Sequence, residues 1–184
     1  MKRRVEFSGF RRIAAKVRCP HAKTSCVRRN VDPQLLPRTP NHTGLVARRD
    51  WTRQWWNEAP SKYELLTSPA VINELSAGIP ERSAQRVSLI RDLPILPIEP
   101  AITDIAAAYI QQKVMPADPT GDALHLAIAS FHKCDFLVTW NCQHIANANK
   151  FGHIRRVNNL LGLFVPALVT PLELLGVDHE PNDP

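Results

Sequence analysis

The sequence lacks the features that mark several common protein classes. No apolar run approaches the roughly 20 residues that cross a bilayer. The basic residues Lys2, Arg3 and Arg4 are not followed by the apolar stretch of a secretory signal. Neither a GxGxxG nor a Walker A loop is present, so the common nucleotide-binding classes lack their phosphate cradle. We therefore expect a cytoplasmic protein with no membrane partner.

Cysteine is also scarce, with four residues in the chain of 184. Without a secretory signal, reduced thiols are expected rather than two disulfides. Cys19, His21 and Cys26 lie near one another in the sequence, but their spacing does not match the close CxxC pairs of structural zinc sites. The cysteines thus favour neither a disulfide scaffold nor a zinc domain.

The charge is distributed unevenly. Residues 1–60 contain 14 Lys and Arg against 4 Asp and Glu, whereas residues 61–184 contain 9 against 13. A basic segment joined to a mildly acidic domain is typical of a phosphate-binding arm. A solvated or misread N-terminus explains the same pattern, and both interpretations stay open. With 44% hydrophobic residues, the chain is expected to form one domain with an extension.

The first 42 residues show no convincing helical or strand period. Prolines at positions 20, 33, 37 and 40 interrupt any helix or central strand. We expect residues 1–42 to form a basic, irregular or disordered arm, residues 43–176 to form the domain, and residues 177–184 to form a C-terminal tail. At the start of the domain, Trp51, Trp55 and Trp56 either pack in the core or stack on nucleic-acid bases, and we favour the core.

From residue 44 onward the chain alternates between helical segments and short apolar runs. Helices are expected at 44–57, 69–78, 80–92, 101–114, 120–133 and 149–163, and strands at 63–67, 94–98, 136–140 and 167–170. Strands separated by helices of ten or more residues imply crossover connections. The sequence therefore predicts a three-layer α/β/α domain with a mostly parallel central sheet, whose first strand is doubtful.

Three polar residues lie at the carboxyl ends of the expected strands or on an adjacent helix, where open parallel sheets bind ligands. They are Glu74, Asp122 and Asn141. Each also has an ordinary explanation: a solvated helix residue, a carboxylate that offsets a helix dipole, and a turn residue. Together they favour a site for a hard divalent cation, because such cations prefer clustered oxygen ligands.

The sequence around these residues resembles the PIN domain family, in particular VapC-like type II toxin ribonucleases. The resemblance rests on TSPAVINELSAG at 67–78, GDALHLAIA at 121–129 and LVTWNCQHIANA at 137–148, and it covers residues 44–176. It implies that Glu74, Asp122 and Asn141 are catalytic and that Glu74 and Asp122 bind Mg²⁺ or Mn²⁺. Asn141 stands where many relatives have Asp, and the resemblance places it beside the metal or its water as a weaker ligand.

Two histidines lie close to these motifs. His125 follows Asp122 by three residues and so lies near the same helix face. We expect His125 to pack or to support the ligands rather than to bind the metal, because oxygen ligands suit Mg²⁺ and Mn²⁺ better. His144 either contacts substrate phosphate, orients Asn141 or is an ordinary loop residue.

The N-terminal segment departs from the family pattern. A PIN domain begins with a hydrophobic strand that ends in an acid, and no such strand is expected before residue 44. The nearest match, AKTSCV at 22–27, has Lys23 where the acid belongs, and Asp32 follows no strand-like run. The sequence therefore predicts that the first catalytic acid is missing, as in a frameshifted or mis-started N-terminus.

The resemblance implies a metal-dependent endoribonuclease, a hydrolase of a toxin–antitoxin system that is paired with a cognate antitoxin protein. The expected substrate is single-stranded or looped RNA, and the activity is expected to be reduced or absent. A homodimer is left open. The first alternative is a catalytically inactive PIN-fold remnant that acts only as a binding protein. The second alternative, a nucleic-acid-binding protein that uses residues 1–60, is less favoured because the basic charge there has no helical or strand organisation.

Overall fold

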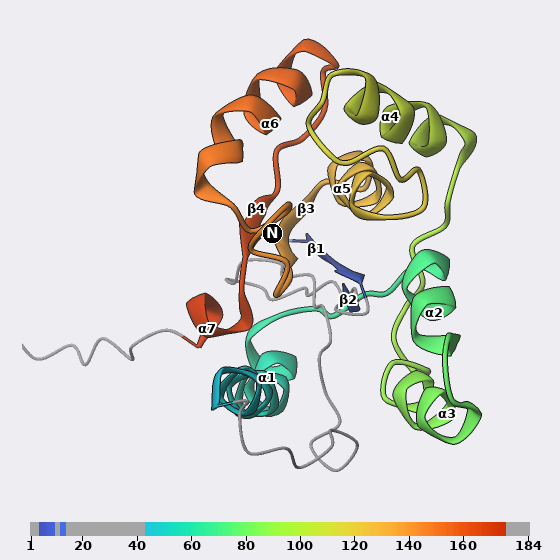
Figure 1. The fold of residues 1–184 in the computed structure, drawn as a ribbon, viewed down its shortest axis with the longest axis vertical. Coiled ribbons are helices and arrows are strands. Elements are labelled where there is room, and N and C mark those ends of the chain that lie inside the picture. Colours follow the sequence, from blue (N-terminus) through green and yellow to red (C-terminus); the bar gives the residue numbers. More distant parts are fainter. Residues whose placement is uncertain (1–3, 10–11, 14–42, 176–184) are drawn as a thin grey trace, which may run out of the picture.

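A computed structural model describes residues 4–9, 12–13 and 43–175, with side chains from residue 46 onward (Figure 1). The strands are β1 (Arg4–Gly9), β2 (Arg12–Ile13), β3 (Cys134–Val138) and β4 (Ala167–Val169). The helices are α1 (Thr43–Lys62), α2 (Pro69–Ser76), α3 (Pro80–Ser88), α4 (Pro100–Gln111), α5 (Asp122–Phe131), α6 (Ala148–Leu160) and α7 (Pro171–Leu174). The six helices expected from the sequence are thus all present, with ends that differ by a few residues.

The four strands form one sheet in the order β2-β1-β3-β4. β1 and β4 both pair with β3 in parallel, and only the short β2 pairs antiparallel, with β1. Helices lie on both sides of this sheet: α4, α5 and α6 on one side, and α1 and α7 on the other (Figure 1). The predicted α/β fold with a mostly parallel sheet is therefore confirmed.

The position of the first strand corrects the sequence-based expectation. The structure places β1 at Arg4–Gly9, inside the segment that was expected to be irregular, and pairs the Cα atoms of Glu6 and Phe7 with those of Leu137 and Val138. The alternation of Val5 and Phe7 with polar residues has the strand period, which the many surrounding arginines obscured. The predictions for Lys23, Asp32, the two cysteines at 19 and 26, and residues 177–184 concern positions outside the described part of the chain.

Two of the expected strands are reduced to a single bridge. Residues 63–67 and 94–98 run side by side only at Thr67 and Ile95. Thr67 donates its N–H to Pro94 O at 2.9 Å and accepts from Leu96 N at 2.7 Å. Pro94 has no N–H to extend the ladder on one side, and Pro69, the first residue of α2, has none to extend it on the other. The expectation of two full strands here is wrong for that reason.

Helix α5 forms the centre of the core. It packs against β1 and β3 on one side and against α4 on the other. The helix therefore has almost no exposed face, and its residues Asp122, Ala123 and His125–Ser130 are all buried. A helix that is apolar all round is typical of such a central position. Its first turn consequently lies next to the sheet.

No helix among the described residues combines the length and the apolar character that a membrane span requires. The longest helix, α1, has 20 residues and contains three arginines. One face of α1 packs inward through Thr52, Trp55 and Ala59, which are all buried. The preference for a core position is thus confirmed for Trp55, which is only 1% exposed.

Candidate active site

Asp122 lies in the first turn of α5 and is nearly buried, with 4% of the residue exposed. The unpaired N–H groups of this turn give the helix start a partial positive charge, which stabilises a carboxylate there. Gly121 precedes it as the N-cap, and a Cβ at this position would collide with the Asp118 carboxylate. The Asp118 side chain in turn accepts hydrogen bonds from the N–H and hydroxyl of Thr120 at 3.0 and 2.9 Å. The turn before α5 is therefore closely packed and fixes where Asp122 begins the helix.

Asn141 contacts Asp122 directly. Its Nδ2 donates to Asp122 Oδ2 at 2.8 Å, so the structure brings together two of the three residues singled out in the sequence. The other side of the amide is also occupied, because Asn141 Oδ1 accepts from the backbone N–H groups of Gln143 and His144 at 3.2 and 3.1 Å. These two donors require an oxygen there, which fixes the orientation of the amide. Asn141 thus orients Asp122, and its own oxygen faces the loop.

Thr139 supports this loop and was not singled out in the sequence. Its hydroxyl accepts from the backbone N–H of Asn141 at 2.9 Å, and the residue is fully buried. Its backbone N–H donates to Val169 O at 2.8 Å, which ties the end of β3 to β4. The signal in the sequence was its position two residues before Asn141, in the same strand-end motif.

Glu74 reaches the same helix from α2. Its Oε1 lies 3.5 Å from Nε2 of His125, one turn after Asp122, and the Glu74 side chain is 24% exposed. His125 itself is fully buried, which agrees with the expected packing role. His144 is half-buried, and its backbone N–H holds the Asn141 amide. Asp122 and Asn141 are therefore in direct contact, whereas Glu74 reaches α5 one turn later, at His125.

The candidate ligands in the described part of the chain are of the chemical type that a hard divalent cation prefers, but they are few. Glu74 and Asp122 offer carboxylate oxygens, the ligands that Mg²⁺ and Mn²⁺ prefer. Among the described side chains, however, no group of three His, Cys, Asp or Glu residues is arranged to hold a metal ion. β1 contains one carboxylate in its sequence, Glu6, whose Cα lies opposite Leu137. Two carboxylates are thus the ligands that the described side chains supply.

An aromatic and cationic surface adjoins the site through Trp140, the residue before Asn141. The Trp140 ring stacks on Trp51 of α1, with centroids 6.1 Å apart and planes inclined by 27°. Its Nε1 donates to Thr52 Oγ1 at 2.8 Å, and the guanidinium of Arg48 lies 5.5 Å from its ring centroid. The strand-end loop that holds Asn141 is therefore anchored to α1.

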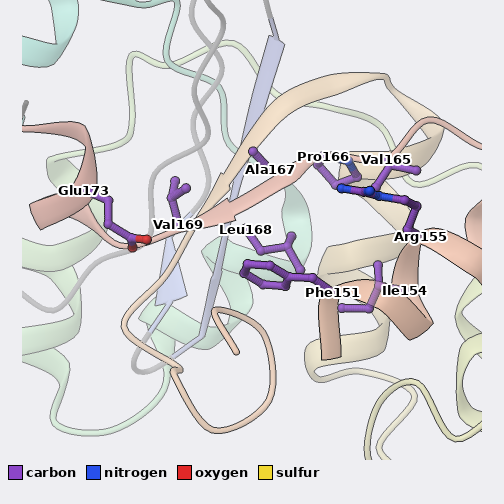
Figure 2. A pocket seen from close by; sticks show the side chains of 9 residues that line it. All are labelled: Phe151, Ile154, Arg155, Val165, Pro166, Ala167, Leu168, Val169 and Glu173. Atoms are coloured by element: carbon purple, nitrogen blue, oxygen red, sulfur yellow. The ribbon is translucent and has the colours of Figure 1, made fainter. Parts of the chain in front are cut away.

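The pocket drawn in Figure 2 lies elsewhere, between α6 and the edge strand β4. It has a volume of about 280 Å³ and is lined mostly by apolar side chains, with Arg155 and Glu173 toward opposite ends. The Glu173 carboxylate accepts from the N–H and hydroxyl of Thr170 at 2.6 and 2.7 Å, as part of the capping box of α7. None of the three candidate catalytic residues lines this pocket, so we do not assign the chemistry to it.

Comparison with family models identifies a match that agrees with this geometry. The model of the PIN domain matches residues 47–146, more than half of the 184 residues, and this range includes Glu74, Asp122 and Asn141. Comparisons with curated proteins and with solved structures gave no significant match. The family match, the mostly parallel sheet and the acidic start of α5 agree, and the chain belongs to the PIN domain family.

Proposed function

We propose that this protein is a metal-dependent endoribonuclease of the VapC-like toxin type, with an activity that is impaired by an incomplete set of acids. PIN domains have a nuclease-like fold and generally depend on divalent metals. The observation that supports the proposal most directly is the hydrogen bond from Asn141 to Asp122 at the start of α5. It holds a nearly buried carboxylate in one orientation, as a metal ligand requires.

In this proposal Glu74 and Asp122 hold Mg²⁺ or Mn²⁺. When bound, the cation supplies an activated water for in-line attack on a phosphodiester and stabilises the leaving oxygen. Asp122 is oriented by the Asn141 amide, and the Asn141 amide is in turn fixed by two backbone N–H groups. His125 lies against Glu74 and limits the positions that this carboxylate adopts. The chain thus contributes ligand charge and ligand orientation.

We further propose that the acid expected at the end of the first strand is missing. Glu6 is the one carboxylate in β1, and it lies three residues before the end of the strand at Gly9. Loss of one ligand charge weakens binding of a hard cation, because affinity rises with the number of carboxylates. On this account Glu6→Gln leaves metal-dependent cleavage unchanged. A loss of cleavage in Glu6→Gln would instead identify Glu6 as the first acid.

The test of the nuclease is cleavage of single-stranded RNA by the full chain in Mg²⁺ or Mn²⁺. We expect slow cleavage that EDTA abolishes and that Asp122→Asn removes. Asp92→Asn is the matched control, because Asp92 has a side chain that is 85% exposed and makes no contact with the site. If wild type and Asp122→Asn show the same background, the nuclease proposal is refuted.

The second candidate is a PIN-fold remnant that acts only as a binding protein. The absence of a three-residue metal cluster among the described side chains favours it. It predicts no metal-dependent cleavage in any variant, together with retained binding of a partner. In either case we propose a cytoplasmic protein whose ligand is RNA. We also propose a cognate antitoxin that covers the acids around α5. The chain alone is then a monomer or a homodimer, and with the antitoxin it forms a complex. Sedimentation of the chain with and without its co-expressed antitoxin distinguishes these assemblies.

A further inference from the structure

A tryptophan of α1 stacks on the loop of the acidic site and is partly exposed to solvent. Trp51 of α1 is 37% exposed, whereas Trp55, one turn later on the same helix, is 1% exposed. Trp51 covers Trp140, and Trp140 is itself held by its hydrogen bond to Thr52. We call Arg48, Trp51 and Trp140 the tryptophan platform. The indole of Trp140 is thus fixed in the fold, and the indole of Trp51 lies on it with part of its surface in solvent.

The charge around the platform is positive. Arg48 lies over Trp140 and forms no ion pair with a carboxylate among the described residues. Arg53 is exposed as well, but residues two positions apart on a helix point to different faces, so Arg53 does not belong to the charge around Trp51. Arg49 is neutralised by Asp50, with 2.9 Å between Nε and Oδ1. The platform therefore combines an exposed ring with one cation, Arg48, that has no carboxylate partner in the described part of the chain, a combination that matches a nucleobase and its phosphate.

The platform is also connected to the acids by the backbone. Trp140 directly precedes Asn141, and Asn141 donates to Asp122. A ligand that stacks on Trp51 thus rests on a residue of α1 that itself packs on the loop that orients Asp122. A protein partner would also use exposed Trp and Arg residues. The link to the acids and the positive charge of Arg48 favour a nucleic acid over a protein.

We propose that the tryptophan platform binds a base of single-stranded RNA, by stacking on Trp51, while Arg48 contacts a phosphate. The proposal deepens the nuclease proposal, because it names the side chain on which a base of the RNA stacks. A base is available for stacking only when it is outside a duplex. The platform therefore selects unpaired segments and positions them next to Asp122.

The test measures RNA affinity without cleavage. The full chain carrying Asp122→Asn, in EDTA, is titrated with a fluorescently labelled single-stranded RNA of about 12 nucleotides, a length within the range of such sites. Fluorescence anisotropy reports binding, and quenching of tryptophan emission reports stacking. We expect Trp51→Ala to weaken binding about tenfold and Trp51→Phe to retain most of the affinity, because stacking needs an aromatic ring. Arg48→Ala is expected to reduce the salt dependence of binding.

Phe164→Ala is the matched control, because Phe164 is an aromatic residue with 38% exposure that does not belong to the platform. It should leave the affinity unchanged, and circular dichroism should show that all variants are folded. The proposal is overturned if Trp51→Ala binds as tightly as its parent, if Phe164→Ala weakens binding equally, or if a duplex of the same sequence binds as well. A change of oligomeric state in Trp51→Ala at unchanged RNA affinity also overturns it, in favour of a protein contact.

The outcome is separable from that of the nuclease proposal. If cleavage depends on Asp122 but Trp51→Ala leaves the RNA affinity unchanged, only the platform proposal is rejected. An affinity that depends on Trp51, with no metal-dependent cleavage by the wild-type chain, rejects the nuclease alone and leaves an RNA-binding PIN domain.

Discussion

Replacement of Asn141 by Asp probes the centre of the site with a change of one functional group. Asn141 Nδ2 lies 2.8 Å from Asp122 Oδ2 and donates a hydrogen bond to it. In Asn141→Asp the backbone N–H groups of Gln143 and His144 keep an oxygen acceptor, but the group that faces Asp122 becomes a second carboxylate. The favourable contact is thereby converted into a repulsion at nearly the same geometry.

The magnitude follows from this geometry. Two unit charges about 4 Å apart repel by about 4 kcal/mol at an effective dielectric constant near 20. Asn141 is half-buried and Asp122 nearly buried, so we expect a loss of roughly 2–4 kcal/mol in the free energy of unfolding without divalent metal. For a chain of this size the melting temperature should fall by about 5–15 °C. A cation between the carboxylates removes the repulsion, so Mg²⁺ or Mn²⁺ should restore much of the loss.

Thermal denaturation with and without about 10 mM Mg²⁺ measures both effects, because a ligand at 100 times its dissociation constant stabilises by about 2.7 kcal/mol. Asn141→Ala is the matched control. It removes the same hydrogen bond without adding a charge, so it should be destabilised but should gain nothing extra from metal. If Asn141→Asp is as stable as the wild type in EDTA, or if Mg²⁺ stabilises it no more than Asn141→Ala, the reasoning about this site is refuted.

The remaining predictions concern the core. Burial raises the pKa of Tyr109 to about 12, so as the pH rises this hydroxyl ionises in the unfolded chain before it does in the folded one. The free energy of unfolding should therefore fall by roughly 2–3 kcal/mol between about pH 10 and about pH 12. In Tyr109→Phe the free energy of unfolding should no longer show this decrease between about pH 10 and about pH 12. At pH 7 the variant should be less stable by about 1–2 kcal/mol, because Asn158 Oδ1 loses its donor. Denaturant titrations at several pH values check both, and a pH dependence that is unchanged in the variant contradicts them. Leu126→Ala in α5 should cost about 2–5 kcal/mol because Leu126 is fully buried, whereas Leu160→Ala, at a residue that is 76% exposed, should change the free energy of unfolding by less than about 0.5 kcal/mol. Equal effects of the two leucine substitutions would contradict the described core.

The sequence predicted the helices and the parallel sheet because their signals are local. α5 has an uninterrupted apolar pattern after Asp122, and β3 is an apolar run of strand length. The region of residues 63–67 and 94–98 could not be predicted in the same way. There the extent of pairing depends on which N–H groups face the partner, and prolines at 69 and 94 remove two of them.

The first strand was missed for a different reason. β1 has only six residues, and its pairing partner β3 is separated from it by more than 120 residues. A strand this short, surrounded by arginines, is specified by its partner more than by its own composition. The strand period of Val5 and Phe7 was therefore too short a signal to place β1 beside β3.

For the site, the sequence predicted which residues lie near one another but not how they contact each other. Asp122 and Asn141 are in direct contact at the start of α5, and Glu74 contacts His125 one turn later. The orientation of Asn141 depends on the N–H groups of the following loop, which residue spacing does not reveal. The same holds for the anchoring of Trp140 on α1, since Thr52 and Trp140 are 88 positions apart.

The central claim is that Glu74 and Asp122 together bind a divalent cation. Its most direct test is a titration of the full wild-type chain with Mn²⁺, followed by electron paramagnetic resonance, in parallel with Glu74→Gln and Asp122→Asn. Because each variant removes one of the two ligand charges while preserving the side-chain shape, we expect binding by the wild type and at least about tenfold weaker binding by each variant. Equal Mn²⁺ affinity in all three proteins, or no binding by the wild-type chain, would contradict the account.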